Sequence, residues 1–358
     1  MKKALLINKG HADNLGDQAI YFVLKKMLEK SGYKVDFVDF TFEEKRNDYI
    51  YLDQANKEIK KDKSKNLLRK VNRLLIKSSF IKNIFWSYAH RSSLKKIKFS
   101  NEYDLAVIGG GQLILSSSVF PSALFKWVKF IRKVFPTAKL AIFGVGVGGG
   151  FHSFEKVLEK KSLKEINNIY LRDMNSIKIL KNELGFEADY TPDVVFNISE
   201  IYPLKVIKKN LILIGITDYL VYKRYNPNKL TKIEYYEKWV AYVKEYSNTN
   251  NKVELFYTSS RDLSESLKFK KYLKDNHNIE IPISEVNNLE DLIKLIAKSK
   301  VVISGRMHGL IIAYSYGSKV IPFILSDKIN SFNEEYVKSS PEIKNIQNKI
   351  NEVFKNII

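Results

Sequence analysis

Short apolar runs alternate with segments of helical periodicity along most of this chain. Runs rich in β-branched residues predict strands, and apolar residues spaced three and four apart predict helices. One series of such elements precedes Pro203 and a second series follows it. The predicted strands are 4–8, 35–40, 104–108, 140–145, 169–171 and 194–196 in the first series, and 211–216, 253–257, 301–303 and 320–324 in the second.

The segment after the first predicted strand has a helical stripe, and residues 289–296 repeat this pattern in the second series. The stripe consists of Ile20, Val23, Leu24, Met27 and Leu28, and Ser31-Gly32 beyond it is typical of a helix end. Strands that alternate with helices predict an α/β fold with two mostly parallel sheets. We expect domains at 1–203 and 204–358, with an interdomain cleft that holds the functional site.

The segment Ser304-Gly305-Arg306-Met307-His308-Gly309 joins the predicted strand 301–303 to a helical run at 310–314. Arg306 offers a planar guanidinium to a phosphate or carboxylate. His308 carries an imidazole, which ordinarily titrates near neutral pH and can give or take a proton. Together they indicate chemistry on a small anionic substrate. The alternative is that both side chains only cap or brace the helix.

Two loops of the first series are further candidates. Residues 11–17 lead into the first predicted helix. Asn14, Gly16 and Asp17 in this loop could bind an anion or a hydroxyl group at the helix N-terminus. The alternative is that they only form a helix cap or a turn. Gly109-Gly110-Gly111 ends a predicted strand. At that place a ligand or the other lobe can approach the backbone closely, unless the glycines only form a tight turn.

Arg172 follows the predicted strand 169–171 and is either a second anion clamp or the partner of Asp173. The glycine run 144–150 contains a GxGxxG pattern, but no helix clearly starts within it, so we expect no dinucleotide cofactor. The chain has no cysteine, and no set of histidines and carboxylates has the spacing of metal ligands. We therefore expect no metal site.

The charge of the chain indicates an anionic partner, because it has 60 lysines and arginines but only 39 aspartates and glutamates, which gives a net charge of +21. The excess is concentrated in residues 60–98, where Asp62 is the only acid. Apolar residues recur at helical spacing in this basic insert, and aromatic residues follow them. Such a helix suits an anionic membrane surface, or it packs on its own domain with a solvated lysine face. No nucleic-acid-binding motif is present, so we expect no nucleic-acid partner.

The absence of cysteine and of any apolar window of membrane-spanning length leads us to expect a cytoplasmic protein. The basic insert adds the expectation that it binds peripherally to the inner face of the cell membrane.

The order of these motifs resembles that of the bacterial polysaccharide pyruvyl transferase family, over about residues 1–325. The motifs are Asn14-x-Gly16-Asp17, Gly109–Gly111, Gly144–Gly149, Leu171-Arg172-Asp173-x-x-Ser176, Pro192-Asp193 and Ser304-x-Arg306-x-His308-Gly309, with Gly317 beyond. The resemblance implies two Rossmann-like lobes in a GT-B-like arrangement. It also implies transfer of the enolpyruvyl unit of phosphoenolpyruvate to sugar hydroxyls, which leaves a pyruvate ketal and free phosphate.

By this resemblance, Arg306 and His308 serve phosphoenolpyruvate binding and proton transfer, and Arg172 contributes to the same anion site. Asn14, Gly16 and Asp17 line the acceptor side of the cleft. Gly110, Gly111, Ser304 and Gly309 complete the candidate substrate-binding set. The expected acceptor is a sugar in a cell-surface polysaccharide or in its lipid-linked precursor.

The chain also departs from the family pattern. Thr217-Asp218-Tyr219 stands where many relatives carry an arginine, and the basic insert 60–98 looks particular to this protein. Both departures bear on the acceptor more than on the donor.

Two alternatives remain. One is a GT-B glycosyltransferase that uses a nucleotide sugar, although Ser326-Asp327-Lys328 stands where retaining enzymes of that kind often place a glutamate. The other is a non-catalytic protein that binds glycan intermediates at a membrane surface.

Overall fold

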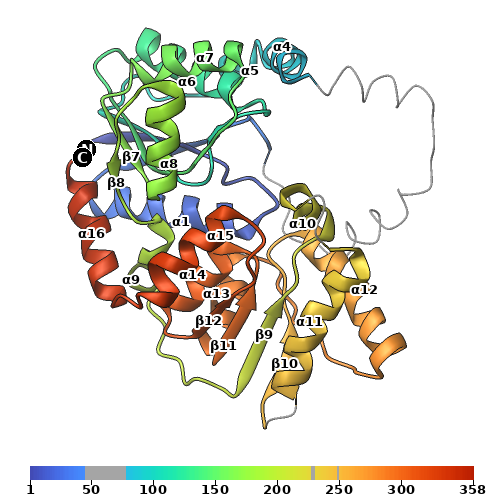
Figure 1. Cartoon of the computed structure of the whole chain (residues 1–358). Coiled ribbons are helices and arrows are strands. Elements are labelled where there is room, and N and C mark those ends of the chain that lie inside the picture. Colours follow the sequence, from blue (N-terminus) through green and yellow to red (C-terminus); the bar gives the residue numbers. More distant parts are fainter. Residues whose placement is uncertain (45–77, 227–229, 248–249) are drawn as a thin grey trace.

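The computed structural model describes residues 1–44, 78–226, 230–247 and 250–358. Two parallel sheets follow one another along the chain (Figure 1). We call the part built on the first sheet the first lobe and the part built on the second sheet the second lobe. The α/β fold with mostly parallel sheets, expected from the sequence, is confirmed.

The first sheet has six strands in the order β2-β1-β3-β5-β7-β8, all parallel to their neighbours. Its strands are β1 (Lys3–Asn8), β2 (Lys34–Asp39), β3 (Leu105–Gly109), β5 (Lys139–Val145), β7 (Asn168–Leu171) and β8 (Asp189–Tyr190). A small parallel pair, β4 (Ile114–Leu115) and β6 (Val147–Gly148), lies beyond the ends of β3 and β5. The helices of this part are α1 (Leu15–Lys30), α4 (Ser79–Ala89), α5 (Ser93–Lys96), α6 (Phe120–Val134), α7 (Ser153–Leu163), α8 (Met174–Ile179) and α9 (Ile198–Ile201).

The second sheet has four parallel strands in the order β10-β9-β11-β12. Its strands are β9 (Leu211–Gly215), β10 (Lys252–Leu255), β11 (Val301–Ser304) and β12 (Lys319–Pro322). The helices that follow or connect them are α10 (Tyr219–Tyr225), α11 (Lys232–Ser247), α12 (Ser260–His277), α13 (Leu289–Lys298), α14 (Met307–Ser315), α15 (Asp327–Phe332) and α16 (Ile343–Lys355).

One continuous core joins the two lobes. The apolar stripe predicted on α1 is buried, and it shares a cluster with Leu292 of α13 and Leu310 of α14. Separate cores cover the outer faces of the sheets, with Trp127 of α6 in the first lobe and Trp239 of α11 in the second. The lobes are therefore held together by packing as well as by the chain that connects them.

Helix α16 returns to the first lobe although it follows the second sheet in sequence (Figure 1). The ring centroid of Phe354 lies 5.3 Å from that of Phe143 in β5, and Lys139 donates from Nζ to the carbonyl of Asn356 at 2.7 Å. The packing order of the helices thus differs from their order in the chain.

The predicted strand at 194–196 is wrong. Val194–Asn197 is a turn of 3₁₀ helix, and Asp193 caps it by accepting a hydrogen bond from the Val195 amide at 3.0 Å. A short apolar run can be buried as a strand or as a helical turn, so its composition does not distinguish the two. Here the capping aspartate favours the helical turn. Within the basic insert, residues 60–77 lie outside the described residues, and α4 begins at Ser79.

Candidate active site

A cavity of about 590 Å³ lies between the two lobes, at the carboxyl ends of both sheets. The first lobe contributes the loop before α1, the segment after β3 and Arg172 after β7. The second lobe contributes the loop between β11 and α14, the start of α12 and Lys328 after β12. In parallel sheets this edge gathers loops from several strands, which is why ligands bind there.

The loop before α1 is both a helix cap and a wall of the cavity. Asn14 is the N-cap residue: its side-chain oxygen accepts from the Gly16 amide at 3.0 Å, and its amide nitrogen donates to Asp17 Oδ2 at 3.2 Å. All three residues line the cavity. The cap interpretation of this motif is confirmed, and capping fixes these residues at the cavity wall, where they remain candidates for ligand binding.

The same loop ties the lobes to each other. Asp13 Oδ2 accepts hydrogen bonds from the amide of Ser260 at 3.0 Å and from its hydroxyl at 2.7 Å. The amide of Leu15 donates to the carbonyl of Thr258 at 2.8 Å. The start of α1 is thereby fixed against the start of α12 at the wall of the cavity.

Arg306 lines the cavity, but its charge is already compensated. Its Nε and Nη2 atoms donate to the two carboxylate oxygens of Asp262 at 2.9 and 2.6 Å. Burial alone would lower the pKa of the guanidinium, but Asp262 holds that pKa above the ordinary arginine value. Asp262 is itself held by the Thr258 hydroxyl and the Asp218 amide. This fork-to-fork pair orients Arg306 firmly.

Arg172 and His308 share one carboxylate. Arg172 Nη1 donates to Asp193 Oδ2 at 3.1 Å, and His308 Nε2 lies 3.5 Å from the same oxygen. Burial works to raise the pKa of Asp193, but His308 and Arg172 lower it to about 2. Asp193 is therefore a carboxylate at any physiological pH and bridges two of the predicted site residues.

His308 also packs closely on the first lobe. A methyl group added at Gly16 would overlap the imidazole, with Nδ1 as its nearest atom. The side chain of His308 is only 12% exposed. The absence of a side chain at Gly16 therefore lets the histidine of the second lobe reach the start of α1.

The structure divides the remaining candidates into two groups. Gly111 and Gly309 line the cavity. Gly110 has φ of +67° and packs against Ile20, and Ser304 is fully buried, where its hydroxyl accepts from the Arg306 amide at 3.0 Å. These two residues shape the loops and do not face the cavity.

Comparison with known families decides what kind of protein carries this cavity. The sequence model of the family described as polysaccharide pyruvyl transferase matches residues 14–327. The chain belongs to this family. Its model spans the cavity-lining loops of both lobes, from Asn14 to the start of α15. No curated protein sequence matches the chain.

This pyruvyl transferase family member shares its fold with GT-B enzymes of sugar metabolism. A solved structure described as an MnaA–UDP co-structure from S. aureus has a TM-score of 0.50 at 11% identity, and the match covers 100% of this chain and 98% of the other. A putative UDP-N-acetylglucosamine 2-epimerase from Listeria monocytogenes has a TM-score of 0.49 at 11% identity, with 98% and 91% covered. At such identities the likeness shows the fold, and the GT-B-like architecture is confirmed.

Sequence reasoning missed several cations of the pyruvyl transferase cavity, namely Lys9, Arg224, Arg261 and Lys328. Lys328, at the start of α15, lines it and has no hydrogen bond or ion pair among the residues that the structure describes. Burial, together with the charges of Arg172 and Arg306, lowers the pKa of its ammonium group to about 8. In the sequence, the position of Lys328 after the last strand of the second sheet was the only indication that it lies at the cavity.

In the described ranges, no cluster of three or more histidines and carboxylates could hold a metal ion. Among the helices described, none has the length and apolar content needed to span a membrane.

Proposed function

We propose that this protein transfers pyruvate from phosphoenolpyruvate to two hydroxyls of a sugar, forms a cyclic ketal and releases phosphate. The observation that carries the proposal is Lys328, a cation without a counter-ion that lies near Arg172 and Arg306 in the interlobe cavity. Like charges held together in a partly closed cavity favour an anionic ligand.

The three cations differ in how they are compensated. Asp262 pairs with Arg306 and Asp193 pairs with Arg172, so Lys328 is the one of these three whose charge is left for a ligand. Arg224 and Arg261 also line the cavity and make no ion pair within the described residues. The Nε atom of Arg172 is also buried without a hydrogen-bond acceptor in the described part of the chain. Phosphoenolpyruvate carries a phosphate and a carboxylate, which suits one free ammonium and additional guanidinium donors.

The transfer begins with addition of an acceptor hydroxyl to the donor. The acceptor oxygen bonds to C2 of phosphoenolpyruvate while C3 takes a proton and becomes a methyl group. The C2–O bond to phosphate then breaks, and a second hydroxyl closes the ketal at C2. Of the two hydroxyl protons, one replaces the proton delivered to C3 and the other leaves with phosphate, so atoms and charges balance.

His308 is the proposed acid that protonates C3, and Asp193 is the group that orients its imidazole. An aspartate behind a histidine fixes the ring and favours its charged form during transfer. Asp17 is the proposed base for the acceptor hydroxyl, because it lines the first-lobe wall of the cavity. General acid catalysis by a positioned side chain contributes roughly 10²–10⁴-fold.

The proposed acceptor is a sugar of a cell-surface polysaccharide or of its lipid-linked precursor. We propose a cytoplasmic location for the enzyme, where phosphoenolpyruvate is present. The chemistry needs no cofactor, since the donor itself supplies the activated enol.

A ligand-dependent thermal shift tests the donor. Phosphoenolpyruvate should raise the melting temperature, and Lys328→Met should abolish most of that rise. Lys319→Met is the matched control, because Lys319 is exposed at the opposite end of β12 and should keep the wild-type response. Stabilisation by UDP but not by phosphoenolpyruvate would replace the proposal with a nucleotide-sugar transferase.

Phosphate release then tests the reaction. With phosphoenolpyruvate and a panel of hexose and N-acetylhexosamine glycosides, the wild type should release phosphate and form a ketal detectable by mass. His308→Gln should bind the donor but lose turnover. Full turnover in His308→Gln would remove the histidine from the mechanism.

A further inference from the structure

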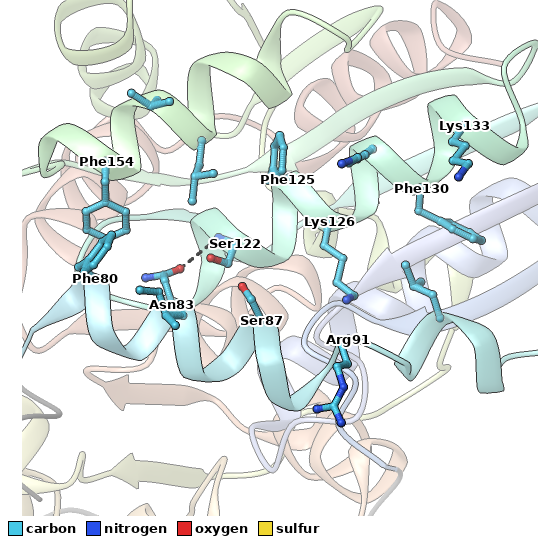
Figure 2. Close-up of a pocket in the computed structure, with 15 residues that line it drawn as sticks. Phe80, Asn83, Ser87, Arg91, Ser122, Phe125, Lys126, Phe130, Lys133 and Phe154 are labelled. Carbon is cyan, nitrogen blue, oxygen red and sulfur yellow. Dashed lines mark hydrogen bonds between the residues drawn. The ribbon is translucent and has the colours of Figure 1, made fainter.

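A second hollow, of about 900 Å³, is lined mainly by residues of α4, α6 and α7. These three helices lie on the side of the first lobe that faces away from the second sheet (Figure 1). The hollow runs between them, and we call it the outer groove. Phe80 of α4 and Phe154 of α7 meet at one end with ring centroids 5.2 Å apart, and Phe130 of α6 lies at the other (Figure 2). The groove belongs to no part of the proposed reaction.

Buried polar contacts fix the wall that α4 provides. Asn83 is only 3% exposed; it donates to the carbonyl of Ser118 at 2.7 Å and accepts from the Ser122 amide at 3.2 Å (Figure 2). Ser79 bonds the buried carboxylate of Glu155 on α7. The groove is therefore held open by specific contacts between its three helices.

The apolar side chains around the groove are unusually exposed for a folded protein. Phe80 and Ile84 are each 52% exposed, and Val157 is 51% exposed. They come from two helices and form one patch around a hollow, and such a patch marks an interaction surface more often than scattered residues do.

The charges around the groove are all of one sign. Arg91, Lys126, Lys129 and Lys133 line it, no acid is among the described residues that do so, and none of the four makes an ion pair within the described chain. Figure 2 shows Lys126 extending from α6 toward the turn that holds Arg91. An apolar floor with a cationic edge complements a hydrocarbon chain that carries a phosphate.

We infer that the outer groove takes a hydrocarbon chain of an anionic phospholipid and docks α4, α6 and α7 on a membrane leaflet. The exposed Phe80 and Ile84 enter the acyl region, and the lysines of α6 meet the phosphates. The bound state is peripheral, since only side chains and the lipid chain cross the interface.

Helix α6 connects this surface to the cavity. Phe120 at its first position lines the cavity, and Lys133 near its last position lines the groove. Ser122, two residues after Phe120, already lines the groove, so the groove begins beside the cavity end of α6 and follows this helix for roughly 17 Å, at 1.5 Å per residue. If the acceptor is lipid-linked, a reading that rests on the proposed function, its sugar reaches the cavity while its lipid stays in the leaflet.

Vesicle co-sedimentation tests the docking with variants of unchanged charge. The groove variant is Ile84→Gln with Val157→Gln, and the control is Ile207→Gln with Ile233→Gln, at positions 90% and 64% exposed outside the groove. Vesicles of phosphatidylcholine with phosphatidylglycerol should bind wild type and control equally, and the groove variant at least tenfold more weakly. Melting temperature confirms that both variants are folded.

A phospholipid with a photoreactive acyl chain tests the groove itself. Cross-links should map to α4, α6 and α7, and soluble glycerol phosphate should not compete. Equal binding by the groove and control variants, or cross-links elsewhere, would overturn the inference and assign the attraction to net charge alone. The groove variant should keep its thermal shift with phosphoenolpyruvate, so failure here is separable from failure of the proposed donor.

Discussion

Asp193 lies with Oδ2 only 3.5 Å from Nε2 of His308, although the two residues follow strands of different sheets. The same oxygen accepts from Arg172 at 3.1 Å. The carboxylate of Asp193 thus contacts both the imidazole of His308, the proposed acid, and the guanidinium of Arg172, a proposed donor-binding group.

Asp193→Asn should lower kcat/KM by about 10- to 100-fold, the usual cost of losing a group that orients a functional histidine. The amide keeps the shape but not the charge that faces Arg172 and His308. Steady-state phosphate release measures the effect. Asp189→Asn, at an exposed position of β8, is the control and should be neutral. A wild-type rate in Asp193→Asn would show that the carboxylate has no part in catalysis.

Gly16→Ala should displace the imidazole of His308 and lower both kcat and the melting temperature, because the new methyl group overlaps the ring. A double-mutant cycle isolates this contact. In a His308→Ala background the same change at Gly16 should cost far less stability. If the loss of stability is equal in both backgrounds, the overlap with His308 is not its cause.

The KM for phosphoenolpyruvate should rise as the pH passes about 8, because the pKa of Lys328 is lowered to about 8 and deprotonation removes one uncompensated positive charge from the cavity. Lys328→Arg keeps the charge at alkaline pH and should flatten this dependence. KM measured from pH 7 to pH 9.5 in both proteins tests the prediction. Parallel profiles for lysine and arginine would exclude Lys328 as the titrating group.

Glu159 should make stability fall as pH rises. This carboxyl is fully buried on α7 without a hydrogen bond in the described residues, and burial, with the charge of Glu155, raises its pKa from 4.5 to about 8. The folded state therefore binds one proton more than the unfolded state between those values. The free energy of unfolding therefore falls as the pH rises from 4.5 to about 8, by about 1.4 kcal/mol per pH unit as an upper bound.

Glu159→Gln removes the titration and should raise the melting temperature at pH 8.5 more than at pH 5. Glu165→Gln, exposed after the end of α7, provides the control and should change neither value. A Glu159→Gln protein with the wild-type pH dependence would show that the carboxyl does not titrate in this range.

The fold was largely predictable, because parallel strands buried on both faces leave apolar runs separated by loops. The pattern located β1, β3, β5, β9 and β11 to within a residue or two at each end. The run at 194–196 failed for a local reason: it is too short for periodicity to separate a strand from a helical turn, and the Asp193 cap decides between them.

The site was predictable only in part. Arg306 and His308 stand in one short motif, but their partners Asp262 and Asp193 come from distant segments, and sequence spacing carries no information on such pairing. Lys328 is one of 60 basic residues and stands in no motif. Its role depends on β12 lying beside β11, which brings the segment after β12 to the cavity.

The return of α16 to the first lobe sets the order in which the chain can mature. Phe143 can meet Phe354 only after the whole second lobe between them has been synthesised. The side-chain amide of Gln347 likewise donates a hydrogen bond to the Phe196 carbonyl, although the two residues lie far apart in the sequence. The first lobe is therefore completed by a segment that is synthesised after the second lobe, although its own sheet comes first in the chain.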